Sequence, residues 1–494
     1  MKTRGMAHQL EGCRRMVGRP TYALFMEQGT GKTWTLLADA ERLYAKGTID
    51  AVLVFAPNGV HTNWVRREIP THMEGDIVAR YWRSGAGVRH TRWVEEIMKP
   101  RSEGEPVPLR ILSMNIDAVI TKKGYEFAER FLLATKALII IDESGRIKNP
   151  DAARTKALMK LRRLAKGARI ATGTPITRAP TDVFAQMQFL EDGVLGTTSY
   201  RAFVAEYADV LPATHPLMQN MMKRNPKAAY AQIIAKNPDG SPRWRNLDKL
   251  QKLLEPHSFR VLKKDCLDLP EKIYKVLPFE LEPEQRRAYE KMDEESRIEL
   301  DDKTELPVSE LAALVKLQQI TSGFVNLPGG GLKYVGEGNP RLKTLMDALE
   351  DVDGKFVVWA RFIEEIYAIR DAMAAAGISV VTYFGETSTA DREAAVDGFQ
   401  NDPNIQGFVG NAQAAGIGLT LTAGETVFYF SNSFDLDHRL QSEDRCHRIG
   451  TKNNVVYIDI VAEDTVDEGI ARNLKRKKNT AAIVLGDARQ ENEG

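Results

Sequence analysis

Short runs of apolar and β-branched residues recur along the chain, and longer segments that resemble helices separate them. The runs hold four to six residues, polar positions bound them, and about 20 or more residues separate most of them. This pattern is typical of buried parallel strands joined by helical crossovers. The predicted strands are residues 52–57, 110–114, 137–142, 168–173, 355–360, 379–384, 426–430 and 455–460.

The predicted strands fall into two groups, residues 52–173 and 355–460. The region between them is charged and helical in pattern, without a strand run of comparable strength. A chain of 494 residues is longer than one hydrophobic core usually serves. We therefore predict an α/β protein with two lobes and a decorated connection.

The amino-acid composition excludes few further classes of protein. The chain is 43% hydrophobic and 27% charged, and its net charge is +1, so overall charge indicates no particular partner. Local charge is uneven, because residues 223–264 hold eleven Lys and Arg against three acidic residues, and residues 280–310 are acidic. The basic stretch is either a solvated helical face or a surface that contacts phosphates.

Three cysteines lie far apart in sequence, which excludes a disulfide scaffold and CxxC-type zinc spacing. No apolar stretch approaches the roughly 18 residues of a membrane span, and the N-terminus does not resemble a signal peptide. We expect an intracellular protein, in the cytoplasm of a bacterial or phage-infected cell, or in the nucleus of a eukaryotic one.

The segment Gln28-Gly29-Thr30-Gly31-Lys32-Thr33 follows the apolar residues 22–26 and precedes a predicted helix. Glycines let backbone N–H groups approach a phosphate, and the helix dipole favours its charge. Lys32 then supplies a positive charge, and Thr33 offers a hydroxyl to Mg²⁺. Met26 occupies the first glycine position of the strict GxxxxGKT pattern.

The strand at residues 138–142 delivers Asp142 and Glu143 at its carboxyl end. A nucleotide-bound Mg²⁺ sits at such a position, where Asp142 would hold the metal and Glu143 would polarise the attacking water. An acidic pair that begins a helix is the alternative, and the phosphate-loop pattern about 110 residues upstream argues against it.

Arg445 and Arg448 lie in the segment 441–450 and are three residues apart. On one helix they would share a face. Two guanidinium groups there would stabilise charge on a transferred γ-phosphate. An RxxR pair alone is usually a solvated helix face, so this interpretation depends on the other motifs.

In chain order these blocks resemble the motifs of superfamily 2 helicases in their SNF2-like form, and the resemblance covers about residues 5–475. The blocks are His8-Gln9 for the Q motif, EQGTGKT (27–33) for motif I, VFAPNGVHTNW (54–64) for Ia, ILSMN (111–115) for Ib, DESGRIKN (142–149) for II, ATGTPITRAPTDVFAQMQFL (171–190) for III, SFRVLKKDCLDLPEK (258–272) for the joining stretch, KFVVWARF (355–362) for IV, YFGETSTADREAAVDGFQ (383–400) for IVa, AAGIGLTLTAGETVFYFS (414–431) for V and QSEDRCHRIG (441–450) for VI.

The resemblance implies two tandem RecA-like lobes, each a parallel sheet flanked by helices, with helical protrusions between and on the lobes. The implied boundaries are an N-terminal lobe at 1–257 with a basic helical insertion at about 193–257, a linker and helical protrusion at 258–335, a C-terminal lobe at 336–478, and a tail at 479–494 that we expect to fray.

The resemblance also assigns site residues, with ATP and Mg²⁺ as cofactors. The implied ATP-binding residues are Gln9, Gly29, Thr30, Gly31, Lys32, Thr33, Gly418 and Gln441. Metal binding falls to Thr33 and Asp142. The implied catalytic residues are Lys32, Asp142, Glu143, Arg445 and Arg448. DNA contacts fall to Pro57, Ser113, Ser388 and Thr422, each of which is equally well explained as a loop or cap residue.

The sequence departs from the family pattern at a few positions. Ser144-Gly145 replaces the usual Ala-His of motif II, so we expect altered coupling between motifs II and III. Thr30 replaces Leu, Thr451 replaces Gln, and Gln413 stands where many chromatin remodellers carry Arg.

We therefore expect an ATP-driven motor that translocates on double-stranded DNA without reading its sequence, built as compactly as phage and bacterial members and acting as a monomer with no membrane partner. The alternative is a branch-migration or fork-remodelling enzyme on junction DNA, which would serve DNA repair. A non-hydrolysing DNA-binding scaffold and a small-molecule P-loop kinase fit the motifs less well. The sequence does not identify a protein partner.

Overall fold

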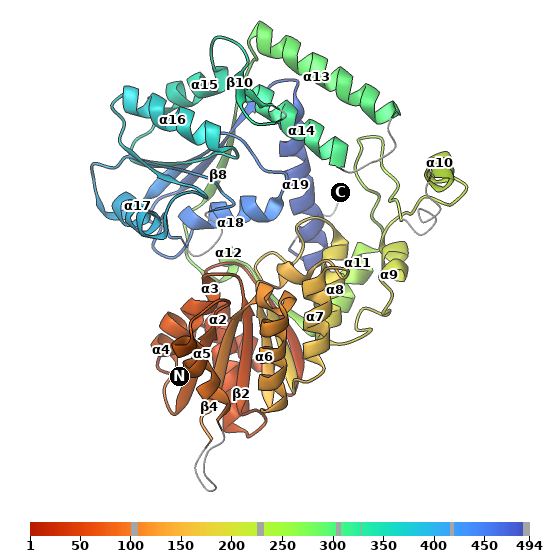
Figure 1. Cartoon of the computed structure of the whole chain (residues 1–494), viewed down its shortest axis with the longest axis vertical. Helices are drawn as coiled ribbons and strands as arrows, with labels where there is room; N and C mark the ends of the chain where they lie inside the picture. The colour runs from red at the N-terminus through yellow and green to blue at the C-terminus, as the bar shows by residue number, and fades with distance from the viewer. Residues whose placement is uncertain (100–106, 225–231, 303–307, 328, 415–418, 488–494) are drawn as a thin grey trace. The chain divides into compact units, whose positions relative to one another are not determined.

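The computed structural model describes residues 1–99, 107–224, 232–302, 308–327, 329–414 and 419–487. The chain forms two compact units, which are visible in Figure 1. Unit 1 comprises Met1–Leu267 and Asn479–Gly494, and unit 2 comprises Asp268–Lys478. Unit 1 therefore takes residues from both parts of the chain that flank unit 2 in sequence.

Unit 1 is built on a seven-stranded sheet in the order β3-β4-β2-β5-β6-β1-β7, and every pairing in it is parallel. In a parallel sheet all strands end at the same edge, so the loops that follow them meet there. The strands are β1 (Thr21–Met26), β2 (Ala51–Ala56), β3 (Ile77–Trp82), β4 (Leu109–Asn115), β5 (Ala137–Asp142), β6 (Gly167–Ala171) and β7 (Ser258–Val261).

Alternate residues of the central strands pack into two separate cores, one on each face of the sheet. In β2, Leu53 and Phe55 belong to one core, and Val52 and Val54 belong to the other. A strand buried on both faces is apolar at every position, which is the pattern that the sequence shows. The helices that cover the two faces are seen around the sheet in Figure 1.

The helices of unit 1 are mostly short. They are α1 (Ala7–Arg15), α2 (Lys32–Ala45), α3 (Val60–Asn63), α4 (Ile69–His72), α5 (Val88–Glu95), α6 (Lys122–Leu133), α7 (Ala153–Arg162), α8 (Val183–Leu190), α9 (Tyr200–Tyr207), α10 (Pro216–Arg224), α11 (Leu247–Leu254) and α12 (Lys263–Cys266), together with the 3-10 and π turns η1 (Trp64–Glu68), η2 (Glu96–Met98), η3 (Ile116–Ile120), η4 (Ser144–Ile147), η5 (Pro180–Asp182) and η7 (Glu255–His257).

Unit 2 repeats the plan with a six-stranded parallel sheet in the order β12-β13-β11-β14-β15-β8 and a separate antiparallel pair, β9 and β10. The strands are β8 (Lys272–Phe279), β9 (Phe324–Asn326), β10 (Leu332–Tyr334), β11 (Lys355–Trp359), β12 (Val380–Tyr383), β13 (Gly407–Gly410), β14 (Gly424–Tyr429) and β15 (Val455–Ala462).

The helices of unit 2 also cover both faces of its sheet. Val358 of β11 packs with residues of α15 and α16, and the adjacent Val357 packs in the opposite core. The helices are α13 (Pro283–Asp302), α14 (Val308–Thr321), α15 (Pro340–Leu349), α16 (Ile363–Ala375), α17 (Thr389–Asn401) and α18 (Leu436–Cys446), and α19 (Val466–Leu485) begins in unit 2 and ends in unit 1. None of the described helices is both long and apolar enough to cross a membrane.

The predicted fold class is confirmed, because two parallel α/β sheets flanked by helices are present. All eight predicted strands and the run at residues 22–26 are strands. The sequence did not predict β3, β7, β8, β13 and the short antiparallel pair β9 and β10. Of these, β3, β7 and β8 are edge strands, which carry more polar residues because fewer neighbours bury them, and β13 holds only four residues.

Two expectations on the connecting segments need correction. Residues 258–335 were assigned to a linker and protrusion, yet β7 pairs with β1 in the first sheet and β8 pairs with β15 in the second. The insertion at about 193–257 is not purely helical, because it contains antiparallel bridges such as Ala208 with Trp244.

The expected fraying of the tail is wrong for its first part. The helix α19 continues to Leu485, and Ala481 and Val484 are buried in a core of unit 1. The apolar run at residues 481–485 is short, and its burial depends on a packing partner that is distant in sequence.

Candidate active site

The phosphate loop runs from the end of β1 to the start of α2, at the carboxyl edge of the first sheet. Gly29 and Gly31 have φ angles of 83° and 85°. A side chain is strained in that left-handed region, so glycine is required at both positions. The first backbone N–H groups of α2 face this loop, which makes its helix terminus a site for an anion.

The short helix α1 brings Gln9 against the loop. The Gln9 side chain, only 6% exposed, donates from Nε2 to the carbonyl oxygen of Thr30 at 3.2 Å, and His8 Nε2 donates to the same oxygen at 2.7 Å. A Cβ atom on Gly31 would lie 1.9 Å from Gln9 Nε2. The predicted Q-motif glutamine and the phosphate loop are therefore in direct contact.

Lys32 is the first residue of α2 and is buried. Its ammonium group donates to the carbonyl oxygens of Met26 at 3.1 Å and Glu27 at 3.4 Å, and Thr30 Oγ1 also donates to Glu27 O. Met26 is the last residue of β1 and points its side chain into the core. Its backbone, not its side chain, serves the loop, so the departure from glycine leaves the loop geometry intact.

Asp142 ends β5 and its carboxylate is buried. Trp64 Nε1 donates to Asp142 Oδ2 at 2.9 Å. Burial raises the pKa of Asp142, while the Trp64 hydrogen bond and the charge of Lys32 act in the opposite direction. A buried carboxylate within the field of Lys32 suits a divalent cation, because the metal's charge offsets the cost of burial.

Glu143 follows Asp142 in a left-handed backbone conformation, with φ 60° and ψ 61°. A non-glycine residue in this region is uncommon, and such conformations cluster at functional sites. Its Oε2 atom accepts a hydrogen bond from Thr172 Oγ1 at 3.0 Å. The loop after β6 therefore fixes the direction of this carboxylate.

Ser144 connects motif II to motif III. Its hydroxyl donates to Gln186 Oε1 at 2.7 Å, and Gln186 Nε2 donates to the carbonyl oxygens of Pro175 and Asp182. The serine that replaces the usual residue therefore joins motif II to motif III by a side-chain hydrogen bond. The Thr33 side chain, in the first turn of α2, is half-buried.

In unit 2 the predicted shared helix face of Arg445 and Arg448 is wrong. The helix α18 ends at Cys446, and Arg448 lies beyond it. Arg448 donates to Leu419 O at 3.2 Å and Thr420 Oγ1 at 2.9 Å, and burial lowers the pKa of its guanidinium. The spacing rule fails because the chain leaves helical geometry at His447.

A buried charge network fixes α18 in unit 2. Glu443 is fully buried, and it accepts hydrogen bonds from Lys272 at 3.2 Å, Tyr274 at 2.7 Å and Arg439 at 2.9 Å. Arg439 also pairs with Asp459 and stacks on the Tyr429 ring at 3.5 Å. Burial opposes the charge on Glu443, but the surrounding Lys and Arg charges lower its pKa to about 2.

Two of the predicted ATP-binding residues, Gln441 and Gly418, belong to unit 2. Gln441 lies on α18, and its Nε2 atom donates to Asp437 Oδ2 at 2.9 Å. Gly418 lies outside the described residues.

The predicted DNA contacts occupy different settings. Pro57 directly follows β2 at the carboxyl edge, and its carbonyl accepts from His61 N. Ser388 is the N-cap of α17, and Thr422 Oγ1 accepts from Gln400. Ser113 is an interior residue of β4 with 0% exposure, so neither its backbone nor its hydroxyl is accessible for the expected contact.

A surface that the sequence reading missed lies on η1, β3 and α5, the segment after motif Ia. The Arg66 and Arg83 guanidinium groups lie 5.2 and 5.4 Å from the Tyr81 ring centroid, and Arg66 also donates to the Tyr81 hydroxyl. Arg67, Arg89 and Arg92 are exposed on the same segment. The alternation of Arg with Tyr and Trp over residues 66–93 is the signal that would have found this surface.

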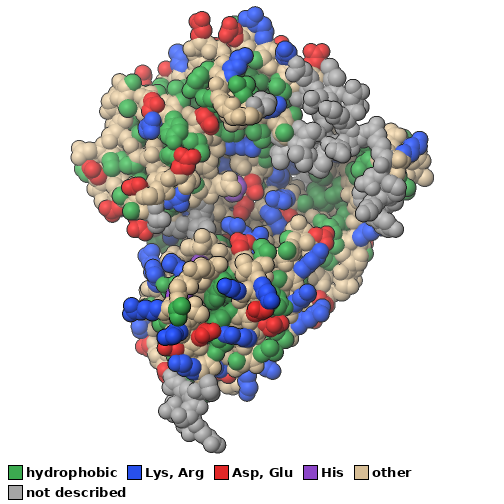
Figure 2. Space-filling view, in the orientation of Figure 1, with side chains coloured by type: hydrophobic (Ala, Val, Ile, Leu, Met, Phe, Trp, Pro, Cys, Tyr) green, Lys and Arg blue, Asp and Glu red, His purple; other side chains and the backbone are tan. Residues whose placement is uncertain are grey.

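The basic stretch that the sequence did indicate, residues 223–264, is partly neutralised. Arg245 pairs with Asp209 at 3.3 Å, and Lys249 pairs with Glu206 at 2.6 Å. Acidic residues from earlier in the chain therefore offset the charge excess counted along the sequence. Figure 2 likewise shows Lys and Arg side chains interspersed with acidic ones on the visible face of unit 1.

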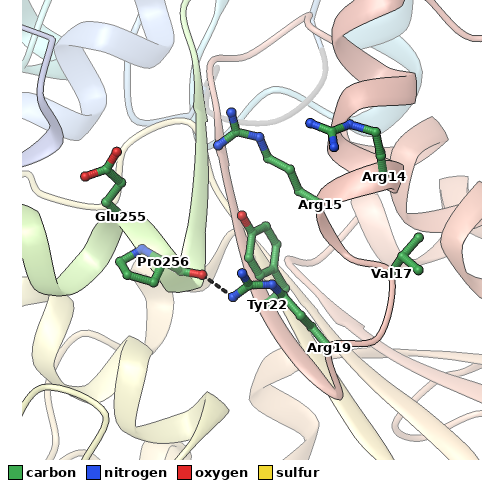
Figure 3. A pocket seen from close by; sticks show the side chains of 7 residues that line it. All are labelled: Arg14, Arg15, Val17, Arg19, Tyr22, Glu255 and Pro256. Carbon is green, nitrogen blue, oxygen red and sulfur yellow. Dashed lines mark hydrogen bonds between the residues drawn. The ribbon is translucent and has the colours of Figure 1, made fainter.

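A hollow in unit 1 has a different location from the phosphate loop. Its lining residues, drawn in Figure 3, are Arg14, Arg15, Val17, Arg19, Tyr22, Glu255 and Pro256. Tyr22 is near the start of β1, whereas the phosphate loop follows its end. The hollow is therefore at the opposite edge of the sheet from the nucleotide-type loop.

The cysteines form no metal site. Within the described residues, no three His, Cys, Asp or Glu side chains are grouped to hold a metal ion. Burial raises the pKa of the Cys13 thiol to about 11 and of the Cys446 thiol to about 12, and that of Cys266 is also raised. All three are free thiols.

Comparison with known proteins gives several relatives. DNA annealing helicase and endonuclease ZRANB3 of Mus musculus is 26% identical over 419 residues, which cover 81% of this chain and 36% of that protein. An uncharacterized ATP-dependent helicase of Mycoplasma pneumoniae is 25% identical over 350 residues, 70% of this chain and 30% of that protein. The chain thus spans about a third of the length of these relatives.

Among solved structures, the Sulfolobus solfataricus SWI2/SNF2 ATPase core in complex with dsDNA is 22% identical. The match covers 99% of this chain and 94% of that chain, with a TM-score of 0.40. The SNF2-related domain matches residues 8–323, and the helicase conserved C-terminal domain matches residues 340–450. Because the first match covers more than half of the sequence, the chain belongs to the SNF2-related family.

Proposed function

We propose that this chain is an ATPase that couples hydrolysis to translocation on double-stranded DNA. The observation that carries the proposal is the convergence at the carboxyl edge of the first sheet. The phosphate loop with Lys32, the buried Asp142 and the Thr172-oriented Glu143 follow β1 and β5, which lie on either side of β6. Together they supply the parts that phosphoryl transfer from ATP to water requires.

The side chains fit ATP with Mg²⁺, which would neutralise the developing charge on the phosphates. Mg²⁺ prefers oxygen ligands, and Asp142 supplies a carboxylate while Thr33 supplies a hydroxyl. Lys32, which donates to two carbonyl oxygens of its own loop, turns the same ammonium to the phosphates. Glu143 orients the attacking water, since its carboxylate is already directed by Thr172.

We also propose that Arg445 and Arg448 stabilise the γ-phosphate during hydrolysis. Support comes from motif VI of the family and from the way that each arginine is held. The backbone of Arg445 is tied to motif V through Leu421 N, and Arg448 holds Thr420 of the same motif. Motif V is therefore hydrogen-bonded to both arginines.

Double-stranded DNA is proposed as the track. Relatives support it, since one is a DNA annealing helicase and another was solved with dsDNA. The arginine surface around Tyr81 gives independent support, because exposed guanidinium groups beside an aromatic ring suit a phosphate backbone without base reading. Branched DNA is the second candidate, favoured by the annealing-helicase relative.

The test is steady-state ATP hydrolysis at one fixed salt concentration, with no DNA, single-stranded DNA, linear duplex and a forked junction. Stimulation by linear duplex supports the translocase, and markedly greater stimulation by the fork supports the junction enzyme. No stimulation by any DNA would refute the motor.

The same assay tests the arginine surface with the double reversal Arg66→Glu/Arg83→Glu. We expect the duplex concentration for half-maximal stimulation to rise about tenfold or more, because two phosphate contacts are lost. Lys122→Glu/Lys123→Glu, an equal charge change on α6, is the control. An equal effect of both variants would show that only the net charge of the protein matters, and not the position of Arg66 and Arg83.

A further inference from the structure

Arg260 lies on the edge strand β7, beside the strand that leads into the phosphate loop. It is opposite Phe25 in the pairing of β7 with β1, and its side chain is 19% exposed. The Nη1 atom of its guanidinium donates to Phe25 O at 3.1 Å and to Gly173 O at 3.2 Å. One guanidinium thus joins the end of β1 to the loop after β6.

Those two segments are packed tightly against each other. A Cβ atom on Gly173 would lie 3.1 Å from the backbone nitrogen of Gln28 and 3.4 Å from Glu27 Cα. The motif III loop is therefore in van der Waals contact with the phosphate loop. A shift of the Phe25 carbonyl would move the end of β1 that leads into the phosphate loop. A shift of the Gly173 carbonyl would move the motif III loop that packs against the phosphate loop.

The carboxylate of Glu27 is the nearest competing partner of Arg260. It lies 3.9 Å from Arg260 Nη2, and its Oε2 atom accepts from Lys263 N at 2.7 Å. The carbonyl of Glu27 also accepts from Lys32 Nζ. A guanidinium that turned toward Glu27 would pull on the residue that holds the phosphate-binding lysine.

Asp487 holds the guanidinium more closely than Glu27 does, at 2.7 Å against 3.9 Å from Nη2. Arg260 Nε donates to Asp487 Oδ1 at 2.9 Å and Nη2 donates to Oδ2 at 2.7 Å, a two-point pair. Asp487 follows α19, and its own N–H bonds Ala482 O. The helix end is fixed because Ala481 and Val484 are buried in the core of unit 1. A two-point Arg–carboxylate pair sets orientation as well as charge.

We propose that Arg260 is a positioning residue for the phosphate loop and that Asp487 sets its orientation, so that nucleotide affinity depends on the docked end of α19. The proposal rests on the proposed ATPase function. Neither residue touches the nucleotide; each acts through the carbonyls of Phe25 and Gly173.

The test compares Asp487→Asn with Asp50→Asn in the full chain. Asp50 forms a half-buried pair with Arg110 in the same unit, at 3.0 Å, on the opposite edge of the sheet from the phosphate loop. Affinity for a fluorescent ATP analogue with Mg²⁺ is titrated, and the melting temperature is recorded. We expect Asp487→Asn to weaken affinity about tenfold through loop misplacement, with Asp50→Asn unchanged in affinity.

Two further variants separate positioning from folding. Asp487→Glu keeps the carboxylate and is expected to restore most of the affinity. Arg260→Lys keeps the charge but has no planar fork, so it is expected to behave like Asp487→Asn. Equal melting shifts for the Asp487→Asn and Asp50→Asn variants with unchanged affinity would overturn the proposal. A wild-type chain that binds no analogue would instead refute the ATPase function itself.

Discussion

The two units hold their chemistry-bearing residues by different means. In unit 1 the site is built from backbone: parallel strand ends, two left-handed glycines and carbonyl oxygens that accept from Lys32. In unit 2 the helix of motif VI is fixed by buried charge, with Glu443 and Arg439 at its centre. A site formed by backbone groups is determined by a contiguous segment of sequence. A site held by buried ion pairs depends on residues that are far apart in the sequence.

The largest expected effect in this comparison comes from Lys32→Ala. Hydrolysis should fall below detection, because the β- and γ-phosphates lose their cation. Affinity for duplex DNA should stay within about twofold, since the surface around Tyr81 is untouched. Hydrolysis and DNA binding are measured on the same preparation, and a parallel loss of DNA binding would show that Lys32 supports the fold.

The buried charge network around Glu443 in unit 2 predicts that the stability of the fold decreases in acid. The folded-state pKa of Glu443 is lowered from 4.5 to about 2, so its stabilisation is fully present above pH 4.5 and is lost as the pH falls toward 2. The contribution is about 3 kcal/mol in the free energy of unfolding.

Chemical unfolding between pH 2 and 6 measures this effect on the wild type and Glu443→Gln. The variant should be less stable at pH 6, because Lys272 and Arg439 lose their partner, and its stability should change less over the acid window. Identical pH dependence in the two proteins would assign the acid response to other carboxylates.

The smallest expected effect tests the backbone-built side. Gly31→Ala and Gly47→Ala both place a side chain at positive φ, which costs about 1–2 kcal/mol. Only at Gly31 does the new Cβ meet another residue, Gln9, whereas nothing lies within 4 Å at Gly47. Both variants should unfold more easily in denaturant, and only Gly31→Ala should also lose ATP affinity. A loss of affinity in both would point to general loosening.

The sequence predicted those features of the structure that a contiguous segment determines. The central strands, the phosphate loop and the acidic pair after β5 were all found, because each is a contiguous pattern with a fixed physical meaning. Arg448 was misplaced since helix geometry was assumed past the residue where α18 ends.

Partners that are distant in sequence account for the rest. Arg260 and Asp487 are 227 residues apart, and no periodicity reveals such a pair. Glu206 and Lys249 are 43 residues apart, so the charge counted in the basic stretch overstated its net value. The burial of Ser113 inside β4 follows from pairing with strands on both sides, one of which, β3, the sequence did not show.

The burial of the native thiols has a practical consequence for measuring motion. With pKa values of about 11 and 12, Cys13 and Cys446 hold about one thiolate in ten thousand or fewer at neutral pH. Maleimide dyes react with thiolate, so a cysteine introduced at an exposed position would be labelled far faster than these two. Fluorescent reporters can therefore be attached in short reactions while Cys13 and Cys446 stay in place.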